Sequence, residues 1–332
     1  MPVDRATPEG TERYRERFAG RAAKDFFRQQ QGLTLSSIGI GTYLGNPDTA
    51  TDVSYTNAIV RAVQLGCNVI DSAANYRFQR SERSIGDALK KLSEQGFARE
   101  ELVICTKGGY LPFDGAPPRN VRDYVNETFV KPGIASFEDI VGGSHCMTPN
   151  YLQNQLDQSL RNMRLECVDV YYIHNPESQL GYVAEQVFYS RLKLAFERLE
   201  ENRKQGTLAY YGVATWNGFR AAAGHHSLVR MVELARQVGG EEHGFRFIQL
   251  PFNMAMPEAT TNANETLDGE QITVVDAARR LDVTVVASAS LLQGRIDPQT
   301  AIQFARSNPG ITTALIGMSR VEHVEENLST SS

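Results

Sequence analysis

From residue 37 to residue 328 the chain alternates between short apolar runs and longer amphipathic stretches. The apolar runs are nearly continuous in Val, Ile and Leu, which is typical of strands buried on both faces of a parallel sheet. Eight strands are predicted in this way, over residues 37–43, 68–71, 101–106, 168–173, 209–214, 246–250, 283–288 and 312–316. The stretches between them carry apolar residues at helical spacing. They predict helices over residues 55–65, 81–92, 151–163, 183–205, 219–238, 271–281, 298–306 and 321–328.

Eight strand-and-helix units of this kind fit one closed barrel. We therefore predict the α/β class, with a single-domain (β/α)8 TIM barrel over residues 32–332. An open doubly wound sheet is the alternative, but that fold normally carries a GxGxxG motif at its first strand–helix turn. The chain has no such motif there.

Two segments depart from the repeating pattern. Residues 1–31 mix Arg with Glu and Asp, and we expect a partly ordered extension that lies on the barrel; a charged helix over residues 9–30 is the alternative. Residues 108–147 are rich in Pro and Gly and follow the third strand. They are too long for an ordinary connection, so they form either an ordered functional loop or a mobile lid. We expect this insertion to lie over the face where the strands end.

The composition narrows the possible functions. The net charge is −5, and basic residues are interspersed with acidic ones, which argues against a nucleic-acid partner. No apolar run is long enough to span a membrane, and residues 1–31 lack the apolar region of a signal peptide. The four cysteines, including the one in His145–Cys146, lack the spacing of metal ligands. We expect a cytoplasmic protein with reduced thiols and no metal site.

Four reactive side chains follow predicted strands, and in a barrel they would converge on one face. They are Asp71, Tyr76, Lys107 and His174. An ammonium group beside a tyrosine favours the phenolate and lowers the phenol pKa from about 10. Asp71 can pair with Lys107, and His174 can orient a substrate oxygen. Together they predict a site in which Tyr76 protonates a carbonyl oxygen as a hydride reaches the carbon.

With these four residues in this order and spacing, the chain resembles the aldo-keto reductase family from about residue 33 to residue 328. The resemblance implies a (β/α)8 barrel, a nicotinamide cofactor, and a catalytic tetrad of Asp71, Tyr76, Lys107 and His174. It also implies a set of cofactor-binding positions. They are Gly41, Thr42, Thr215, Asn217, Gln249 and Ser288 toward the nicotinamide, and Ser319, Arg320, His323, Glu326 and Asn327 toward the adenosine.

Three positions differ from the common pattern of this family. A Ser-Asn pair usually follows the fifth strand, where this chain has Ala214–Thr215 and then Trp216–Asn217. A tyrosine often stacks on the nicotinamide where this chain has Ser288. Members that prefer NADP often have an arginine at the position of His323, and Arg320 could supply that charge instead, near a helix N-terminus that favours anions. We expect NADP as the cofactor, with NAD possible.

The resemblance implies an enzyme that interconverts an aldehyde or ketone and its alcohol. Its partner would be a small carbonyl or alcohol substrate, with no nucleic acid and no membrane. One alternative is oxidation of a sugar or sugar-like alcohol, since the same four residues work in both directions. The other is a cofactor-binding regulatory subunit with weak catalysis. The sequence predicts neither the substrate nor the oligomeric state.

Overall fold

A computed structural model describes residues 4–220, 225–291 and 297–329. Eight strands form a closed barrel in the order β11-β12-β3-β4-β5-β6-β7-β8, and all neighbouring strands are parallel. Their bounds are β3 (Ile38–Gly41), β4 (Val69–Asp71), β5 (Val103–Gly108), β6 (Val168–His174), β7 (Leu208–Ala214), β8 (Phe245–Pro251), β11 (Thr284–Ser288) and β12 (Thr313–Gly317). The predicted (β/α)8 barrel is confirmed.

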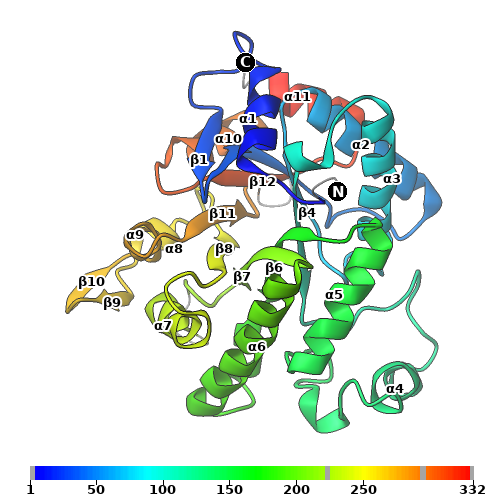
Figure 1. Ribbon diagram of the computed structural model, residues 1–332, viewed down its shortest axis with the longest axis vertical. Coiled ribbons are helices and arrows are strands. Elements are labelled where there is room, and N and C mark those ends of the chain that lie inside the picture. Colours follow the sequence, from blue (N-terminus) through cyan, green and yellow to red (C-terminus); the bar gives the residue numbers. More distant parts are fainter. Residues whose placement is uncertain (1–3, 221–224, 292–296, 330–332) are drawn as a thin grey trace.

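Helices surround the barrel and bury one face each against the strands (Figure 1). They are α2 (Thr49–Gln64), α3 (Arg80–Glu94), α5 (Pro149–Met163), α6 (Glu185–Gln205), α7 (Leu228–Gly239), α9 (Val274–Arg280), α10 (Pro298–Ser307) and α11 (Val321–Ser329), with the short α8 (Glu258–Thr261) before α9. No helix among the described residues is long and apolar enough to cross a membrane.

Two helices, α7 and α9, begin three or more residues later than the sequence predicts, because capping residues set their starts. In α7 the Ser227 hydroxyl accepts a hydrogen bond from the backbone N–H of Arg230, so the helix begins at Leu228 rather than at residue 219. Residues 221–224 of that prediction lie outside the described residues. In α9 Thr273 caps the helix in the same way. The preceding residues form an antiparallel hairpin of β9 (Glu265–Leu267) and β10 (Glu270–Ile272), seen at the left of Figure 1.

The N-terminal residues form a short helix and a hairpin rather than one long helix. Helix α1 (Pro8–Glu16) is followed by the antiparallel strands β1 (Phe27–Gln30) and β2 (Leu33–Ser36). Leu33 and Leu35 are buried in one apolar cluster with strand residues that include Val103 and Phe247. Since β2 leads directly into the start of β3, the hairpin covers the end of the barrel where the strands begin.

The insertion after β5 has a small apolar core of its own. It carries α4 (Val121–Val125), a short π-helix (Asn126–Val130) and a 3-10 helix (Phe137–Asp139). Its core includes Val125 and Phe129, which pack with Cys146 and with Tyr151 of α5. Figure 1 shows α4 set out from the barrel at the lower right. The two ends of the insertion meet beside β6 through an isolated antiparallel bridge between Tyr110 and His145.

Candidate active site

Four polar side chains lie at the carboxyl ends of barrel strands. Asp71 is the last residue of β4 and His174 the last of β6, while Lys107 and Gln249 lie near the ends of β5 and β8. The parallel register pairs Lys107 with Tyr172 and His174 with Ala214. Because the strand ends of a closed barrel meet at one rim, residues more than 170 positions apart in the chain become neighbours.

The centre of the site is a buried ion pair. The Nζ atom of Lys107 lies 2.5 Å from Oδ2 of Asp71, and the two side chains are 0% and 4% exposed. Lys107 also donates to the backbone oxygen of Ser72 at 2.7 Å, and Gln249 donates to Oδ1 of Asp71 at 2.8 Å. Burial alone would lower the pKa of Lys107, but the negative charge of Asp71 raises it above its usual value. The ammonium form is therefore held in a fixed position.

Tyr76 lies over this pair. Its ring centre is 5.0 Å from Nζ of Lys107 and 5.8 Å from the ring centre of His174, edge to face. Burial raises the pKa of Tyr76, and Lys107 opposes that shift without reversing it. As predicted from the sequence, Lys107 lowers the pKa of Tyr76. Burial, which that prediction left out, has the larger effect on this pKa and raises it. In the free protein the phenol therefore keeps its proton at neutral pH.

A strained turn sets the position of Tyr76. The next three residues, Arg77, Phe78 and Gln79, all have left-handed backbone angles, with φ of 46°, 57° and 70°. Side-chain-bearing residues adopt this region only at a cost of about 1–2 kcal/mol each. Arg77 holds the turn, since its guanidinium donates to Ser81 at 3.0 Å and to Asp52 at 2.7 Å. Sequence reasoning did not identify Arg77, because a buried arginine has no distinctive sequence pattern.

His174 is a neutral imidazole in this environment. Burial lowers its pKa well below the usual value, and the charge of Lys107 acts in the same direction. Its Nδ1 atom is buried and has no hydrogen-bond partner within the described ranges. Its backbone oxygen lies 2.8 Å from Nε2 of His145, a residue of the insertion that sequence reasoning considered only as a metal ligand. A neutral imidazole can donate one hydrogen bond to a substrate oxygen.

The predicted nicotinamide-binding residues are only partly gathered around the tetrad. Gly41 pairs in register with Gly317, and a Cβ atom at Gly41 would meet nothing closer than 3.8 Å, so the space beside it is open. The Thr42 hydroxyl donates to the backbone oxygen of Asp71 at 3.0 Å. Ser288 ends β11, and its backbone oxygen accepts from Phe252 at 3.1 Å. Because Gly41 has no side chain and polar groups lie beside it, the open space there fits a flat ring such as nicotinamide.

In the loop after β7, Thr215 and Asn217 make contacts other than those expected for cofactor-binding residues. The Thr215 hydroxyl accepts from the backbone N–H of Gly218 at 2.7 Å. Asn217 is exposed, and its Oδ1 lies 3.4 Å from a guanidinium nitrogen of Arg220. The structure therefore does not bring the Asn217 side chain together with the tetrad. A carboxylate oxygen of Glu177, which sequence reasoning missed, accepts from the backbone N–H groups of residues 216 and 217 at 2.8 and 3.0 Å.

The residues predicted for the adenosine end lie together at β12 and α11. Arg320 donates to Nε2 of His323 at 2.5 Å, and the backbone oxygen of Ser319 accepts from Ser54 at 2.6 Å. Glu326 is exposed and Asn327 buried, both within α11. A guanidinium at the start of this helix, near its positive end, fits a phosphate group.

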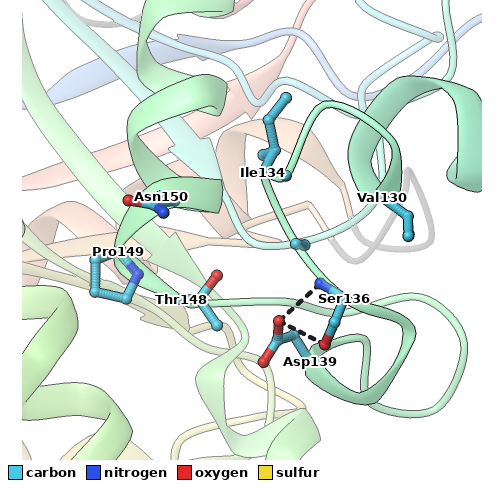
Figure 2. A pocket seen from close by; sticks show the side chains of 9 residues that line it. Val130, Ile134, Ser136, Asp139, Thr148, Pro149 and Asn150 are labelled. Carbon is cyan, nitrogen blue, oxygen red and sulfur yellow. Dashed lines mark hydrogen bonds between the residues drawn. The ribbon is translucent and has the colours of Figure 1, made fainter.

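A cavity of about 410 Å³ lies elsewhere, between the insertion and the start of α5. Figure 2 shows Thr148, Pro149 and Asn150 on one side of it, and Asp139 hydrogen-bonded to Ser136 on the other. None of the predicted site residues lines this cavity. Across the described ranges, no group of three or more His, Cys, Asp and Glu side chains is placed to hold a metal ion.

Comparisons with known proteins agree with this architecture. The model of the Aldo/keto reductase family matches residues 37–299. A putative voltage-gated potassium channel subunit beta of Schizosaccharomyces pombe is 25% identical over 91% of this chain and 86% of its own length. An NADH-specific methylglyoxal reductase of Escherichia coli is 26% identical over 55% of this chain and 49% of its own length.

Solved structures show the same fold at low sequence identity. The glycerol dehydrogenase of Gluconobacter oxydans has a TM-score of 0.63 at 16% identity, covering 93% of this chain and 91% of that one. An aldo/keto reductase of Klebsiella pneumoniae, solved with NADP and acetate, has a TM-score of 0.59 at 16% identity, covering 93% and 90%. Since the family model spans most of the closed barrel, the chain belongs to the aldo/keto reductase family of NAD(P)-dependent oxidoreductases.

Proposed function

We propose that the protein interconverts a small aldehyde or ketone and its alcohol, with Tyr76 as the general acid and base. The observation that carries the proposal is the buried Lys107–Asp71 pair with the Tyr76 ring 5.0 Å from the ammonium nitrogen. A phenol next to a fixed ammonium can give up a proton, because the phenolate that remains is stabilised by the adjacent positive charge.

The tetrad divides the chemistry among its members. A bound nicotinamide cofactor supplies the hydride, which carries two electrons to the carbonyl carbon. Tyr76 gives its phenolic proton to the carbonyl oxygen, so that the alcohol forms and a phenolate remains beside Lys107. The neutral imidazole of His174 donates a hydrogen bond that orients the same oxygen. Solvent then returns a proton to Tyr76, and the oxidative reaction runs through the same groups in reverse.

We infer NADP as the preferred cofactor, with NAD as a weaker substitute. Gly41, Thr42, Thr215, Gln249 and Ser288 would surround the nicotinamide end, and Ser319, Glu326 and Asn327 the adenosine end. Arg320 carries the preference, because its guanidinium lies next to His323 at the start of α11 and can pair with a 2′-phosphate. The Klebsiella pneumoniae neighbour contains NADP, whereas the Escherichia coli relative is NADH-specific.

The residues around the strand ends favour a substrate with an apolar part. Tyr43, Trp216 and Met254 follow β3, β7 and β8, and their side chains are 59%, 43% and 42% exposed. Tyr43 also lies edge to face against Tyr76, with ring centres 5.0 Å apart, so its apolar ring is next to the position proposed for the substrate. We also propose a cytoplasmic location, which suits the four buried free cysteines.

One experiment tests the function. The protein is mixed with NADPH or NADH and a panel of aldehydes, ketones and sugars, and absorbance of the reduced nicotinamide is followed. Tyr76→Phe should lower turnover by about 10²- to 10⁴-fold while cofactor binding persists. Tyr210→Phe is the matched control, since its hydroxyl donates to Gln31 in the N-terminal hairpin connection. Equal turnover by wild type and Tyr76→Phe would refute the assignment of Tyr76.

A second candidate is a cofactor-binding regulatory subunit. It is favoured by the Schizosaccharomyces pombe relative, which matches along 91% of this chain. The same assay separates the two candidates. Tight cofactor binding without turnover on any member of the panel would support the regulatory subunit and exclude the enzyme.

A further inference from the structure

The base of the insertion, residues 109–111 and 144–146, is built against His174. The backbone N–H of Leu111 donates to Ser144 at 2.8 Å, and that of Cys146 donates to Gly109 at 2.8 Å. These bonds join the two ends of the insertion beside the last residue of β6. The insertion is therefore attached to the barrel at the predicted catalytic histidine.

Within this base, the His145 side chain has defined partners on both ring nitrogens. Gln179 donates from Nε2 to His145 Nδ1 at 3.1 Å, so the ring proton resides on Nε2. That nitrogen donates to the backbone oxygen of His174 at 2.8 Å. Arg191 of α6 fixes Gln179 in turn, donating to its Oε1 at 2.6 Å. His145 is 1% exposed and stays neutral at physiological pH, since burial lowers its pKa to about 4.

The imidazole of His145 lies beside the backbone oxygen of His174, just beyond the last paired residues of β5 and β6. Strand β5 ends at Gly108, which pairs with Ile173. Gly109 follows with φ of 143°, a backbone conformation that favours glycine. A Cβ atom at Gly109 would lie 2.9 Å from His145 Nε2 and 3.0 Å from the His174 oxygen. The glycine thus makes room for His145, which supplies the hydrogen bond that a buried carbonyl requires.

Tyr110 completes the support. Its ring lies edge to face against both histidines, with ring centres 5.3 Å from His145 and 5.1 Å from His174. Its hydroxyl lies 3.1 Å from the Ser178 hydroxyl and accepts from Asn175 Nδ2 at 3.2 Å. The backbone of His174 is therefore fixed by His145, and its ring is packed against Tyr110.

We propose that His145 is a positioning residue for the reaction, acting through His174. The proposal rests on the proposed role of His174 in orienting the substrate oxygen. It assigns to the base of the insertion a task in the reaction, which is to hold the His174 imidazole at the angle that proton transfer at Tyr76 needs. A displacement of about 1 Å at such a group can cost about a hundredfold in rate.

Two substitutions at the same position test this role. His145→Phe keeps a ring of similar size but removes the donor, and should lower kcat by about ten- to a hundredfold with KM for the cofactor nearly unchanged. His145→Gln carries an amide N–H near the position of Nε2 and should restore most of kcat. His243→Phe is the control, since His243 is also buried but precedes β8 at the other end of the barrel. Unchanged kcat in His145→Phe, or an equal loss in His243→Phe, would overturn the proposal.

A second measurement does not depend on activity. The chain has six histidines, so nitrogen NMR of the ¹⁵N-labelled rings can follow each one from about pH 5.5 to about pH 8. We expect His145 as an Nε2–H tautomer that does not titrate in this range, and a shift of the His174 signals in His145→Gln and His145→Phe. A titrating or Nδ1–H His145 would contradict the proposal even if His145→Phe does not fold. An inactive wild type with the expected tautomer would instead contradict only the proposed reaction.

Discussion

At the scale of single residues, the site depends on one charge pair removed from water. Lys107 and Asp71 are almost fully buried, and each also has a further polar partner, Ser72 or Gln249. Breaking a buried pair costs more than the pair contributes, because the remaining charge has no solvent to stabilise it. This asymmetry makes the pair testable by stability as well as by activity.

Asp71→Asn should lower the free energy of unfolding by about 3–5 kcal/mol at neutral pH. Without the carboxylate, burial holds the pKa of Lys107 below that of the unfolded chain. The loss of stability is then full at a pH below the pKa of Lys107 in the folded variant. It disappears as the pH rises to the pKa of lysine in the unfolded chain, about 10.4. Urea denaturation at about pH 7 and about pH 9.5 measures this recovery. Asp87→Asn, which breaks the exposed pair with Arg164, should cost less than about 1 kcal/mol at either pH.

The pH dependence of reduction follows from two other groups. His174 is neutral because burial lowers its pKa well below the usual value, and Tyr76 is protonated because burial raises its pKa. We therefore expect kcat/KM for reduction to be flat from about pH 6 to about pH 8 and to fall only when Tyr76 loses its proton. The profile is best measured with NADH, since a 2′-phosphate titrates near about pH 6. A half-maximal loss near about pH 6.5 would show that His174 is not held neutral.

At the scale of elements, the insertion contacts both the loop that carries Tyr76 and the end of β6, where His174 lies. Its residue Gly115 donates to the backbone oxygen of Phe78 at 2.9 Å, and Gln79 donates to that of Phe113 at 3.2 Å. We propose that this segment shapes the substrate pocket, as expected for a loop after a barrel strand. The outer part of the insertion would then select the substrate, while its base, residues 109–111 and 144–146, would hold His174.

Replacing residues 112–142 with a short Gly-Ser linker should change KM and substrate preference while cofactor binding persists. The linker keeps the bridge between Tyr110 and His145, so the support of His174 remains. Steady-state constants for several aldehydes and cofactor titration by fluorescence measure the two effects. Unaltered constants across the panel would show that the insertion takes no part in substrate recognition.

The sequence allows the elements to be predicted better than the details of the site. The eight strands can be predicted because each is an apolar run. The polar residues that follow them can be grouped into one site because the strand ends of a barrel meet at one rim. The left-handed turn at Arg77, Phe78 and Gln79 cannot be predicted from the sequence, since long-range contacts impose this conformation on residue types that normally avoid it. The role of His145 is also hidden, because its partner is a backbone oxygen that no residue type reveals.

At the scale of the whole molecule, the site and the N-terminal extension lie at opposite ends of the barrel. Helix α1 is anchored near the strand starts, where Arg17 pairs with Glu101 at 2.9 Å and Arg13 with the same carboxylate at 3.3 Å. The Glu101 side chain is 0% exposed. The Tyr14 hydroxyl donates to the backbone oxygen of Val63 at 2.5 Å. The extension therefore contributes to stability through buried contacts that include the Glu101 carboxylate and the Tyr14 ring, far from Tyr76.

Removal of residues 1–17 should lower the free energy of unfolding by about 3–5 kcal/mol, because Glu101 loses both guanidinium partners. Activity per folded molecule should be unchanged, since residues 4–17 are anchored near the strand starts, at the opposite end of the barrel from the tetrad. Adding Glu101→Gln to the truncated chain removes the unpaired charge and should recover part of the loss. Thermal denaturation and kcat/KM, measured on the three proteins, separate the two effects. A truncated chain that keeps its stability but loses turnover would place the extension in the catalytic cycle instead.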